Sequence, residues 1–389
     1  MHETIIDRTS GVAGDRMKIA VVGAGINGIM SAWALARAGH AVDLFERGQA
    51  MNETSSVSSK LLHGGLRYLE HGQLALVHEG LRERAWWLDS APHLTRKLHM
   101  VLPVYRRSPR GRIILKLGLL AYDLLAGKQR LGWHCWMSRV ELQALVPSLR
   151  SDSLTGGYLF FDGQMDDRAL GLWALERARA QGVSLRENSP VERVDTQGAV
   201  SIDGRIERFD FVVNAAGPWA MRLLQASAVK CRHHLDLVRG SHLVVDGSVE
   251  VGFVLQSPDD GRVCFVLPYR GRTLIGTTEM RQTLEQPAVC SDAERAYLLR
   301  LFNAHFLPAL STEHVIETFA GLRPLVAQSA ARADAVSREY VIETNERLVS
   351  VFGGKWTTSR ALGRSVVRAI ERSGAPKGLA HQERSCDKG

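Results

Sequence analysis

No run of this sequence reaches the roughly 18–20 apolar residues that a helix needs to cross a membrane, so a membrane-spanning helix is not expected. Cysteine is scarce: Cys135, Cys231, Cys264, Cys290 and Cys386 are odd in number and form no CxxC pair. That pattern disfavours a disulfide framework, a zinc site and an iron–sulfur cluster, and it fits a reducing compartment. No charged-then-apolar signal peptide opens the chain, so a cytoplasmic location is expected.

Acidic residues are outnumbered: 41 Asp and Glu stand against 49 Lys and Arg in 389 residues, which gives a net charge of +8. This balance favours an acidic partner, such as a phosphorylated substrate, an anionic cofactor or an anionic membrane surface, although a merely solvated basic surface gives the same count. Nucleic acid is not an expected partner, because the basic residues are dispersed and do not cluster with stacking aromatics. The length predicts one large domain or two interleaved domains.

The most apolar segment, GRIILKLGLLAYDLLAG at residues 111–127, still contains two basic residues and one acidic residue. We expect a helix that packs inside the protein. The alternative is a peripheral membrane contact, in which Lys116, Arg106, Arg107 and Arg110 meet lipid headgroups. That contact would place the protein on the inner face of the cytoplasmic membrane.

Residues 18–47, KIAVVGAGINGIMSAWALARAGHAVDLFER, follow the order strand, glycine-rich turn, helix, strand. Gly23, Gly25 and Gly28 have the G-x-G-x-x-G spacing, which allows a tight turn, close approach to a pyrophosphate and close helix–strand packing. Glu46 ends the second strand, where a carboxylate can accept hydrogen bonds from ribose hydroxyls. The segment therefore predicts a dinucleotide site, but it does not choose between NAD and FAD.

Two later segments favour FAD. VVNAAGPWA at 212–220 is an apolar strand that breaks at small residues, which suits backbone lying close to a cofactor. Residues 348–374 read as a strand, a glycine pair and a helix, whose N-terminus can stabilise anionic charge at the N1–C2=O edge of a reduced flavin. An ordinary strand-to-helix turn would look the same. Since no second G-x-G-x-x-G occurs, three separated contact segments around one dinucleotide predict FAD.

Further runs along nearly the whole chain carry a resemblance to a known family: SSVSSKLLHGGLRYLEHG (55–72), APHL (91–94), DDRAL (166–170), VNAAGPWA (213–220), RGSHLVV (239–245), LIGTTE (274–279), HFLPALS (305–311), GLRPL (321–325), SREY (337–340) and SVFGGKWTT (350–358). With these runs the chain resembles the FAD-dependent glycerol-3-phosphate dehydrogenases, of the D-amino-acid-oxidase-like flavoprotein superfamily.

The resemblance implies an α/β fold, with a Rossmann-like FAD-binding domain of the D-amino-acid-oxidase type and an interleaved α+β substrate domain built on an antiparallel sheet. We expect the FAD-binding domain to comprise residues 17–95, 155–230 and 340–380, and the substrate domain 96–154 and 231–339. Polar residues 1–16 predict a disordered leader and residues 381–389 a tail.

The implied reaction is oxidation of sn-glycerol 3-phosphate to dihydroxyacetone phosphate, with hydride passing from substrate C2 to flavin N5 and electrons leaving for quinone or another acceptor. Arg67, Arg323 and Arg338 match substrate-binding arginines, and planar guanidinium groups suit a dianionic phosphate. Tyr68 is expected to line the same pocket.

Two histidines are candidate bases, because the pKa of imidazole lies close to neutrality. We prefer His242, which a strand of the substrate domain can point into the pocket, over His63, which the following glycines place against the flavin ring. Lys355 is expected near the flavin and the substrate oxygen, where its ammonium favours the reduced anionic flavin. Thr358 is a neutral donor to the same oxygen.

The expected cofactor contacts combine the fingerprint, the loop after it and the two later segments: Gly23, Gly25, Ile26, Asn27, Gly28, Glu46, Arg47, Ser55, Ser56, Ser59, Lys60, Leu61, His63, Gly64, Gly65, Val191, Ala216, Gly217, Trp219, Gly354, Lys355, Trp356, Thr357 and Thr358. No metal is expected. Asp162, Asp166 and Asp167 lack further ligands at a suitable spacing and are interpreted as caps of a helix that begins near Arg168.

The chain departs from the family pattern at three places. GGKWTTSR stands where the family has GGKLTTYR, GTTE replaces GTTD, and a C-terminal helical domain of roughly a hundred residues is not expected within this length. Two alternatives therefore stay open: a FAD enzyme for another small anionic hydroxy or amino acid, and a non-catalytic FAD-binding subunit.

Overall fold

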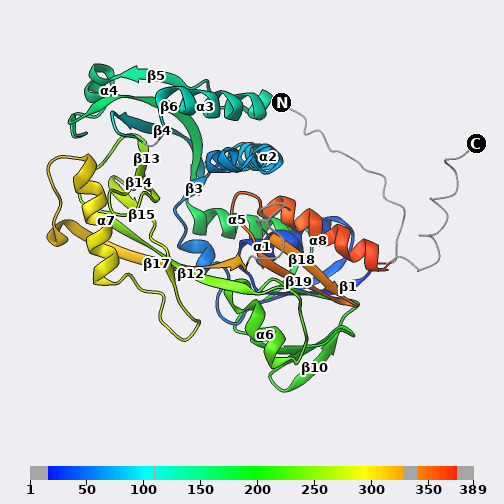
Figure 1. Cartoon of the computed structure of the whole chain (residues 1–389). Helices are drawn as coiled ribbons and strands as arrows, with labels where there is room; N and C mark the ends of the chain where they lie inside the picture. Colours follow the sequence, from blue (N-terminus) through cyan, green and yellow to red (C-terminus); the bar gives the residue numbers. More distant parts are fainter. Residues whose placement is uncertain (1–15, 109, 328–339, 375–389) are drawn as a thin grey trace, which may run out of the picture.

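The computed structural model describes residues 16–108, 110–327 and 340–374; the predicted tail, Arg338 and nearly all of the predicted leader lie outside these ranges. Two sheets dominate the fold, and helices pack on both (Figure 1). The first has six strands in the order β18-β19-β11-β1-β2-β7, namely β18 (Tyr340–Asn345), β19 (Leu348–Gly353), β11 (Phe211–Asn214), β1 (Lys18–Val22), β2 (Ala41–Phe45) and β7 (Ser184–Arg186). Only β18 runs antiparallel to its neighbour.

The apolar run of β1 is explained by cover on both faces of this sheet. Ile19 and Val21 pack with the helices α1 (Ile26–Arg37), α5 (Asp167–Ala180) and α8 (Ser359–Gly374). Ala20 and Val22 point the other way, into a core shared with α6 (Ala220–Ala226) and a small sheet of β8 (Val191–Val194), β9 (Ala199–Ile202) and β10 (Arg205–Arg208). Because the side chains alternate between two buried faces, no position of the strand after Lys18 is polar.

The second sheet has ten strands: β3 (Leu61–Leu62), β4 (Thr95–Tyr105), β5 (Cys135–Ser138), β6 (Leu154–Met165), β12 (Leu235–Val245), β13 (Gly252–Gln256), β14 (Val263–Tyr269), β15 (Arg272–Gly276), β16 (Met280–Arg281) and β17 (Val315–Val326). All of its pairings are antiparallel except that of β13 with β4. Residues 61–62 and 155–165, which the sequence analysis assigns to the FAD-binding domain, pair within this sheet.

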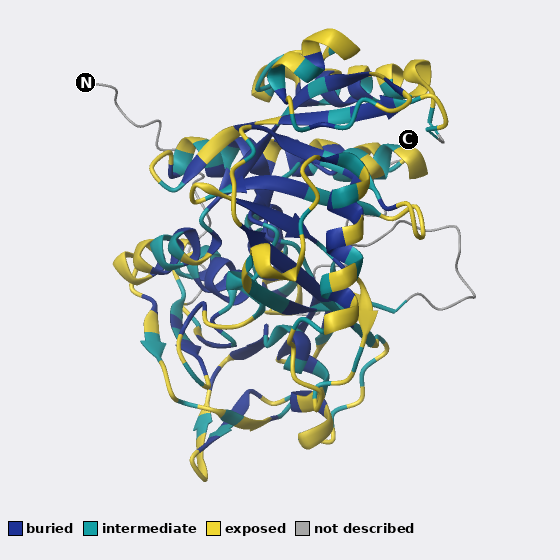
Figure 2. Ribbon diagram, turned by 90° about the vertical axis from the view of Figure 1, so that its left-hand side faces the viewer, coloured by how far each residue is buried: buried dark blue, intermediate teal, exposed yellow. Residues whose placement is uncertain are grey.

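Four further helices and five 3₁₀ turns complete the described fold: α2 (Leu74–Ser90), α3 (Arg112–Ala126), α4 (Arg139–Leu145) and α7 (Asp292–His305), with η1 (Thr54–Ser56), η2 (Leu66–His71), η3 (Gly127–Gln129), η4 (Gly217–Trp219) and η5 (Thr312–His314). Figure 2 shows that buried residues follow the sheets, whereas helices at the rim present exposed faces. Among the described helices, none is both long and apolar enough to span a bilayer.

Helix α3 only partly meets the expectation that it packs inside the protein. Its inner residues Leu119, Tyr122 and Ala126 are buried. Its outer face is exposed and apolar, with Ile113, Ile114, Leu117, Leu120 and Leu124 facing outward. The apolar residues of this segment therefore fall into two groups: one packs in the core, and the other is exposed on the surface.

A cluster of five tryptophans joins α1, α2, α5 and the turn that leads into α8. The Trp87 ring lies 4.8 Å from Trp86, 6.4 Å from Trp173 and 5.2 Å from Trp356, between ring centroids. Trp33 lies 6.0 Å from Trp86 and 6.1 Å from Trp173. Edge-on and tilted contacts of this kind are the favoured geometries of aromatic pairs. The tryptophan at 356 is thus part of the core.

Candidate active site

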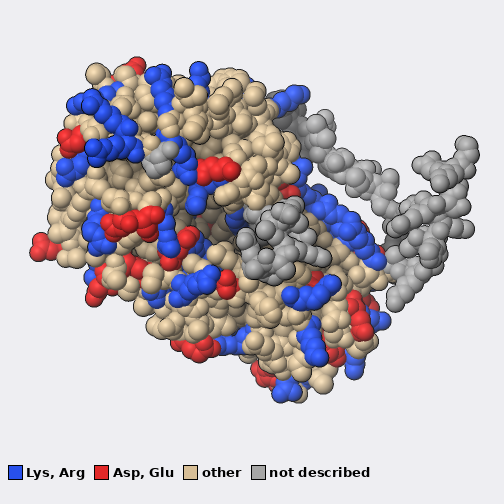
Figure 3. All heavy atoms as spheres, viewed as in Figure 1, with Lys and Arg blue, Asp and Glu red and all other residues tan. Residues whose placement is uncertain are grey.

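A cavity of about 840 Å³ is lined by residues from both sheets. The fingerprint turn, the loop after β2 and the turn before α8 line one part of it, and strands β4, β6, β12, β13, β14 and β17 line the other. Figure 3, viewed as in Figure 1, shows that acidic and basic side chains are interspersed on this face of the molecule.

The fingerprint glycines lie where the backbone must come close to other groups. A Cβ on Gly23, whose φ is +100°, would lie 2.7 Å from the Ala215 carbonyl oxygen. A Cβ on Gly28 would lie 1.8 Å from the Gly23 oxygen, which is the close helix–strand packing expected of the third glycine. At the start of α1, the Ile26 N–H donates to Ser55 Oγ at 3.0 Å, so the loop after β2 reaches the helix N-terminus.

The polar groups around this part of the cavity fit an anionic dinucleotide. Glu46 directly follows β2, accepts hydrogen bonds from the Ala24 and Gly48 N–H groups, and retains acceptor capacity for ribose hydroxyls. Arg47 stacks 3.8 Å from the centre of the Trp219 ring. Asn27 Oδ1 is buried and has no hydrogen-bond partner in the described part of the chain.

Most predicted site residues line this one cavity: Gly23, Gly25, Ile26, Asn27, Glu46, Arg47, Ser55, Ser59, Leu61, His63, Gly65, Arg67, Tyr68, Val191, Ala216, Gly217, Trp219, His242, Arg323, Gly354, Lys355, Trp356 and Thr357. Thr358 is buried and does not line it, and Ser56 and Gly64 also lie outside the lining. The position of Arg338 is not described.

The side chain of Lys60 does not face the cofactor cavity, contrary to the sequence analysis. Its Nζ lies 2.8 Å from both carboxylate oxygens of Asp167 and donates to the Ser56 carbonyl oxygen. Both partners of the ion pair are buried. An ammonium at that depth needs a paired carboxylate, and Asp167 supplies it.

The three aspartates have three different roles. Asp166 caps α5 by accepting from the Ala169 N–H, as predicted. Asp167 accepts from the Arg168 N–H in the first turn of α5 and also forms an ion pair with Lys60. Asp162 forms an ion pair with Arg84 at 2.7 Å, so the capping interpretation is wrong for Asp162. Lys60 and Arg84 lie far in sequence from the aspartates that they pair with, and only the tertiary fold brings each pair together.

His242 points into the cavity from β12, beside Ser59. Its Nε2 lies 2.9 Å from Ser59 Oγ, and its ring stacks on Phe319 of β17 with centroids 4.8 Å apart. Burial, followed by the charges of Lys60 and Arg323, lowers the pKa of His242 to about 3. The imidazole is therefore neutral at physiological pH, and the burial and neighbouring charges that keep it neutral also weaken it as a base.

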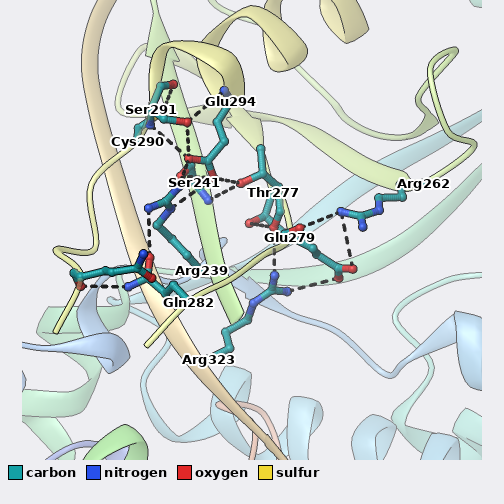
Figure 4. A network of polar contacts seen from close by, with 12 residues as sticks. Arg239, Ser241, Arg262, Thr277, Glu279, Gln282, Cys290, Ser291, Glu294 and Arg323 are labelled. Atoms are coloured by element: carbon teal, nitrogen blue, oxygen red, sulfur yellow. Dashed lines mark hydrogen bonds and ion pairs between the residues drawn. The ribbon is translucent and has the colours of Figure 1, made fainter. Parts of the chain in front are cut away.

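Arg323, on β17, belongs to a polar network around Glu279 and Glu294 (Figure 4). Its Nη2 donates to the Thr278 carbonyl oxygen at 2.9 Å, and its Nη1 lies 3.6 Å from Glu279 Oε1. Glu279 also approaches Arg262. The glutamate that replaces the usual aspartate of GTTD is thus the acidic neighbour of the expected phosphate-binding arginine, a relation that the sequence analysis did not find.

The glycine opposite His242 explains part of the LIGTTE run. Gly276 of β15 pairs with His242 in the sheet register. A Cβ at this position would lie 2.2 Å from His242 Cδ2. The absence of a side chain at Gly276 therefore makes room for the imidazole.

Lys355, Tyr68 and Arg67 converge on the same cavity. Lys355 Nζ lies 3.9 Å from the centre of the Tyr68 ring. Burial, and then the positive charge of Arg67, lower the pKa of Lys355 to about 7. Burial likewise lowers the pKa of His63 to about 4, so this imidazole too is neutral near pH 7.

Trp356 lines the cavity but also belongs to the tryptophan cluster. Its Nε1 donates to the Ser55 carbonyl oxygen at 2.8 Å. A larger side chain than the family's leucine is therefore accommodated by the core and anchors the loop after β2.

Comparison with known proteins decides the family. A profile described as FAD dependent oxidoreductase matches residues 18–369. The chain belongs to this family. A glycerol-3-phosphate dehydrogenase of Pseudomonas aeruginosa is 35% identical over 375 residues, covering 91% of this chain and 71% of the relative. A D-erythritol 1-phosphate dehydrogenase of Brucella abortus is 34% identical, covering 88% and 71%.

A solved structure confirms the predicted fold. The glycerol-3-phosphate dehydrogenase from Bacillus halodurans, complexed with FAD, has a TM-score of 0.72 and 26% identity; the match covers 92% of this chain and 65% of that one. This member of the FAD-dependent oxidoreductase family thus combines the expected cofactor domain with a largely antiparallel substrate sheet. FAD is the cofactor that the glycine turn, Glu46 and Asn27 fit.

Proposed function

We propose that this FAD-dependent oxidoreductase oxidises sn-glycerol 3-phosphate to dihydroxyacetone phosphate and passes the electrons to quinone or another acceptor. The supporting observation is the convergence of Arg67, Arg323, Lys355 and neutral His242 on one cavity. The arginines bind the phosphate and fix the position of C2, and His242 takes the hydroxyl proton. FAD, when bound, supplies the hydride acceptor.

A second substrate of the same class is favoured by the relatives. The dehydrogenases for glycerol 3-phosphate and D-erythritol 1-phosphate are almost equally similar to this chain. Both compounds place a secondary alcohol near a phosphate, so the arginine clamp suits either.

Anaerobic bleaching of the flavin separates the alternatives. We expect rapid loss of flavin absorbance with glycerol 3-phosphate or D-erythritol 1-phosphate. Bleaching only by a hydroxy or amino acid that lacks phosphate would contradict a phosphorylated substrate. A protein that none of these compounds bleaches would be a FAD-binding subunit.

Arg323→Ala tests the phosphate clamp. Hydrogen bonds to charged groups contribute about 1.5–3 kcal/mol, so we expect KM to rise about 10- to 100-fold while FAD content is unchanged. The matched control is Arg300→Ala, which removes an arginine whose side chain is 57% exposed and pairs with Asp259. An unchanged KM in the Arg323 variant would contradict the assignment.

We also propose that α3 contacts an anionic membrane surface. Leu117, Leu120 and Leu124 follow helical spacing on one exposed face, and Ile113 is 74% exposed. Arg106, Arg107 and Lys116 are exposed nearby and supply positive charge. An apolar helical face with a basic rim is typical of helices that lie in the headgroup region.

Vesicle co-sedimentation tests this contact. Leu117→Glu should lower binding to vesicles of anionic phospholipid, because it places a carboxylate in the apolar face. Ile206→Glu is the control, since Ile206 is 70% exposed on β10, in the small sheet. Equal binding of both variants and the unaltered protein would contradict the proposal, and so would binding that is as strong to purely zwitterionic vesicles.

A further inference from the structure

A buried charged cluster lies behind the loop of residues 63–68. Arg84 of α2 is 1% exposed, Asp162 of β6 is 5% exposed and Tyr122 of α3 is 2% exposed. The three residues come from three different elements. None belongs to the cofactor fingerprint or to the expected substrate clamp.

Hydrogen bonds join the three side chains to one another and to the loop. Arg84 Nη1 lies 2.7 Å from Asp162 Oδ1, and the Tyr122 hydroxyl donates to the same oxygen at 2.7 Å. The Gly64 N–H donates to the Tyr122 hydroxyl at 2.9 Å and to Asp162 Oδ1 at 3.2 Å. One backbone N–H of the loop is thus held by two members of the cluster.

Gly64 is seated directly on this cluster. A Cβ at this position would lie 2.5 Å from the Tyr122 hydroxyl and 2.4 Å from Leu81 Cδ2. Its chain neighbours His63 and Gly65 line the cavity, as do Arg67 and Tyr68 immediately beyond. The position of Gly64 therefore determines the direction in which those side chains enter the site.

The attraction between the charges of Arg84 and Asp162 does not by itself explain why the cluster is polar. A buried ion pair can often be replaced by well-packed apolar side chains with little loss of stability, because desolvation of the charges offsets much of their attraction. An apolar cluster, however, would leave the Gly64 N–H buried without an acceptor. The polar cluster instead supplies acceptors for the Gly64 N–H and so fixes the position of the loop.

We propose that Arg84, Asp162 and Tyr122 are positioning residues, which hold Gly64 and thereby orient His63 toward the cofactor and Arg67 toward the substrate. The part that concerns Arg67 rests on the proposed function. The part that concerns His63 requires only that FAD binds.

Tyr122→Phe tests the proposal, with Tyr158→Phe as the matched control. Tyr158 is also 2% exposed, and its hydroxyl donates to the Arg112 carbonyl oxygen at 3.1 Å, outside the cluster. Each substitution removes one hydroxyl from a buried ring. FAD content, Tm, the absorption spectrum of bound flavin and the rate of anaerobic bleaching are measured for both variants.

We expect Tyr122→Phe to shift the flavin absorption bands and to slow bleaching by about tenfold per bound flavin, an effect of the size of one misplaced binding group. Tyr158→Phe should match the unaltered protein in spectrum and rate. If the two variants behave alike in both, the proposal is overturned. Lower Tm or FAD content in Tyr122→Phe, with spectrum and rate per flavin unchanged, also overturns it.

Two further outcomes of the experiment also have a defined meaning. If glycerol 3-phosphate and D-erythritol 1-phosphate fail to bleach even the unaltered protein, the proposed substrate is wrong, and the flavin spectrum alone decides the positioning role. If Tyr122→Phe does not fold, Arg84→Lys replaces it, since it keeps the charge that pairs with Asp162 and removes the guanidinium fork. The same spectral shift is then required.

Discussion

Lys355 combines a basic side chain with a site that disfavours its charge. Buried lysines lose the solvation of their ammonium group, and a nearby arginine adds repulsion. Both causes act here, and they bring the pKa of Lys355 to about 7. The residue is therefore protonated below that pH and neutral above it, whereas an ordinary lysine stays charged to about pH 10.

We expect kcat/KM to fall as pH rises through about 7, if the Lys355 ammonium assists the reaction. Binding of an anionic phosphate beside Arg67 favours the ammonium, so the fall in kcat should lie at higher pH. Lys355→Arg retains its charge over this range and should remove the fall. A profile that is flat from pH 6 to 9 in the unaltered protein, or equally steep in Lys355→Arg, would contradict the role.

At the scale of elements, the pairing of strands determines the position of the His242 side chain. β12 lies between β15 and β17, and its His242 pairs with Gly276 on one side and Phe319 on the other. One neighbour provides space and the other provides a stacking surface. The imidazole is therefore fixed by cross-strand partners rather than by its neighbours in sequence.

Gly276→Ala should displace this imidazole, because the new methyl group would lie 2.2 Å from Cδ2. We expect kcat to fall at least about tenfold, with FAD retained, since misplacement of a catalytic base costs that much or more. Gly118→Ala in α3 is the control, because nothing lies within 4 Å of its added Cβ. Equal turnover in the two variants would argue against His242 as the base.

The elements that the sequence predicts well are those specified by neighbouring residues. The β1–α1–β2 unit follows from an apolar run, three spaced glycines and Glu46, all within thirty residues. Contacts between segments that are distant in sequence cannot be predicted in this way. Lys60 meets Asp167, Arg323 meets Glu279, and Gly64 meets Tyr122, because sheets and helices bring those segments together. No local pattern encodes such pairs.

At the scale of the whole molecule, the site exists only where the two sheets meet. The cofactor side of the cavity comes from the six-stranded sheet and its loops, whereas the proposed base His242 and the proposed clamp residue Arg323 come from β12 and β17 of the ten-stranded sheet. The loop of residues 54–68 contacts both parts, as Thr54 donates to the Leu322 carbonyl oxygen while Ser55 reaches α1. Relative placement of the sheets thus sets the alignment of substrate and cofactor.

The tryptophan cluster gives the protein an optical property. Five indoles lie in contact, and one of them, Trp356, borders the cofactor cavity. Indole emission overlaps the near-ultraviolet absorption of oxidised flavin, so we expect the excited indoles to transfer energy to a bound FAD. We therefore expect the intrinsic fluorescence of the chain to fall when FAD binds, so that it reports cofactor occupancy without a label.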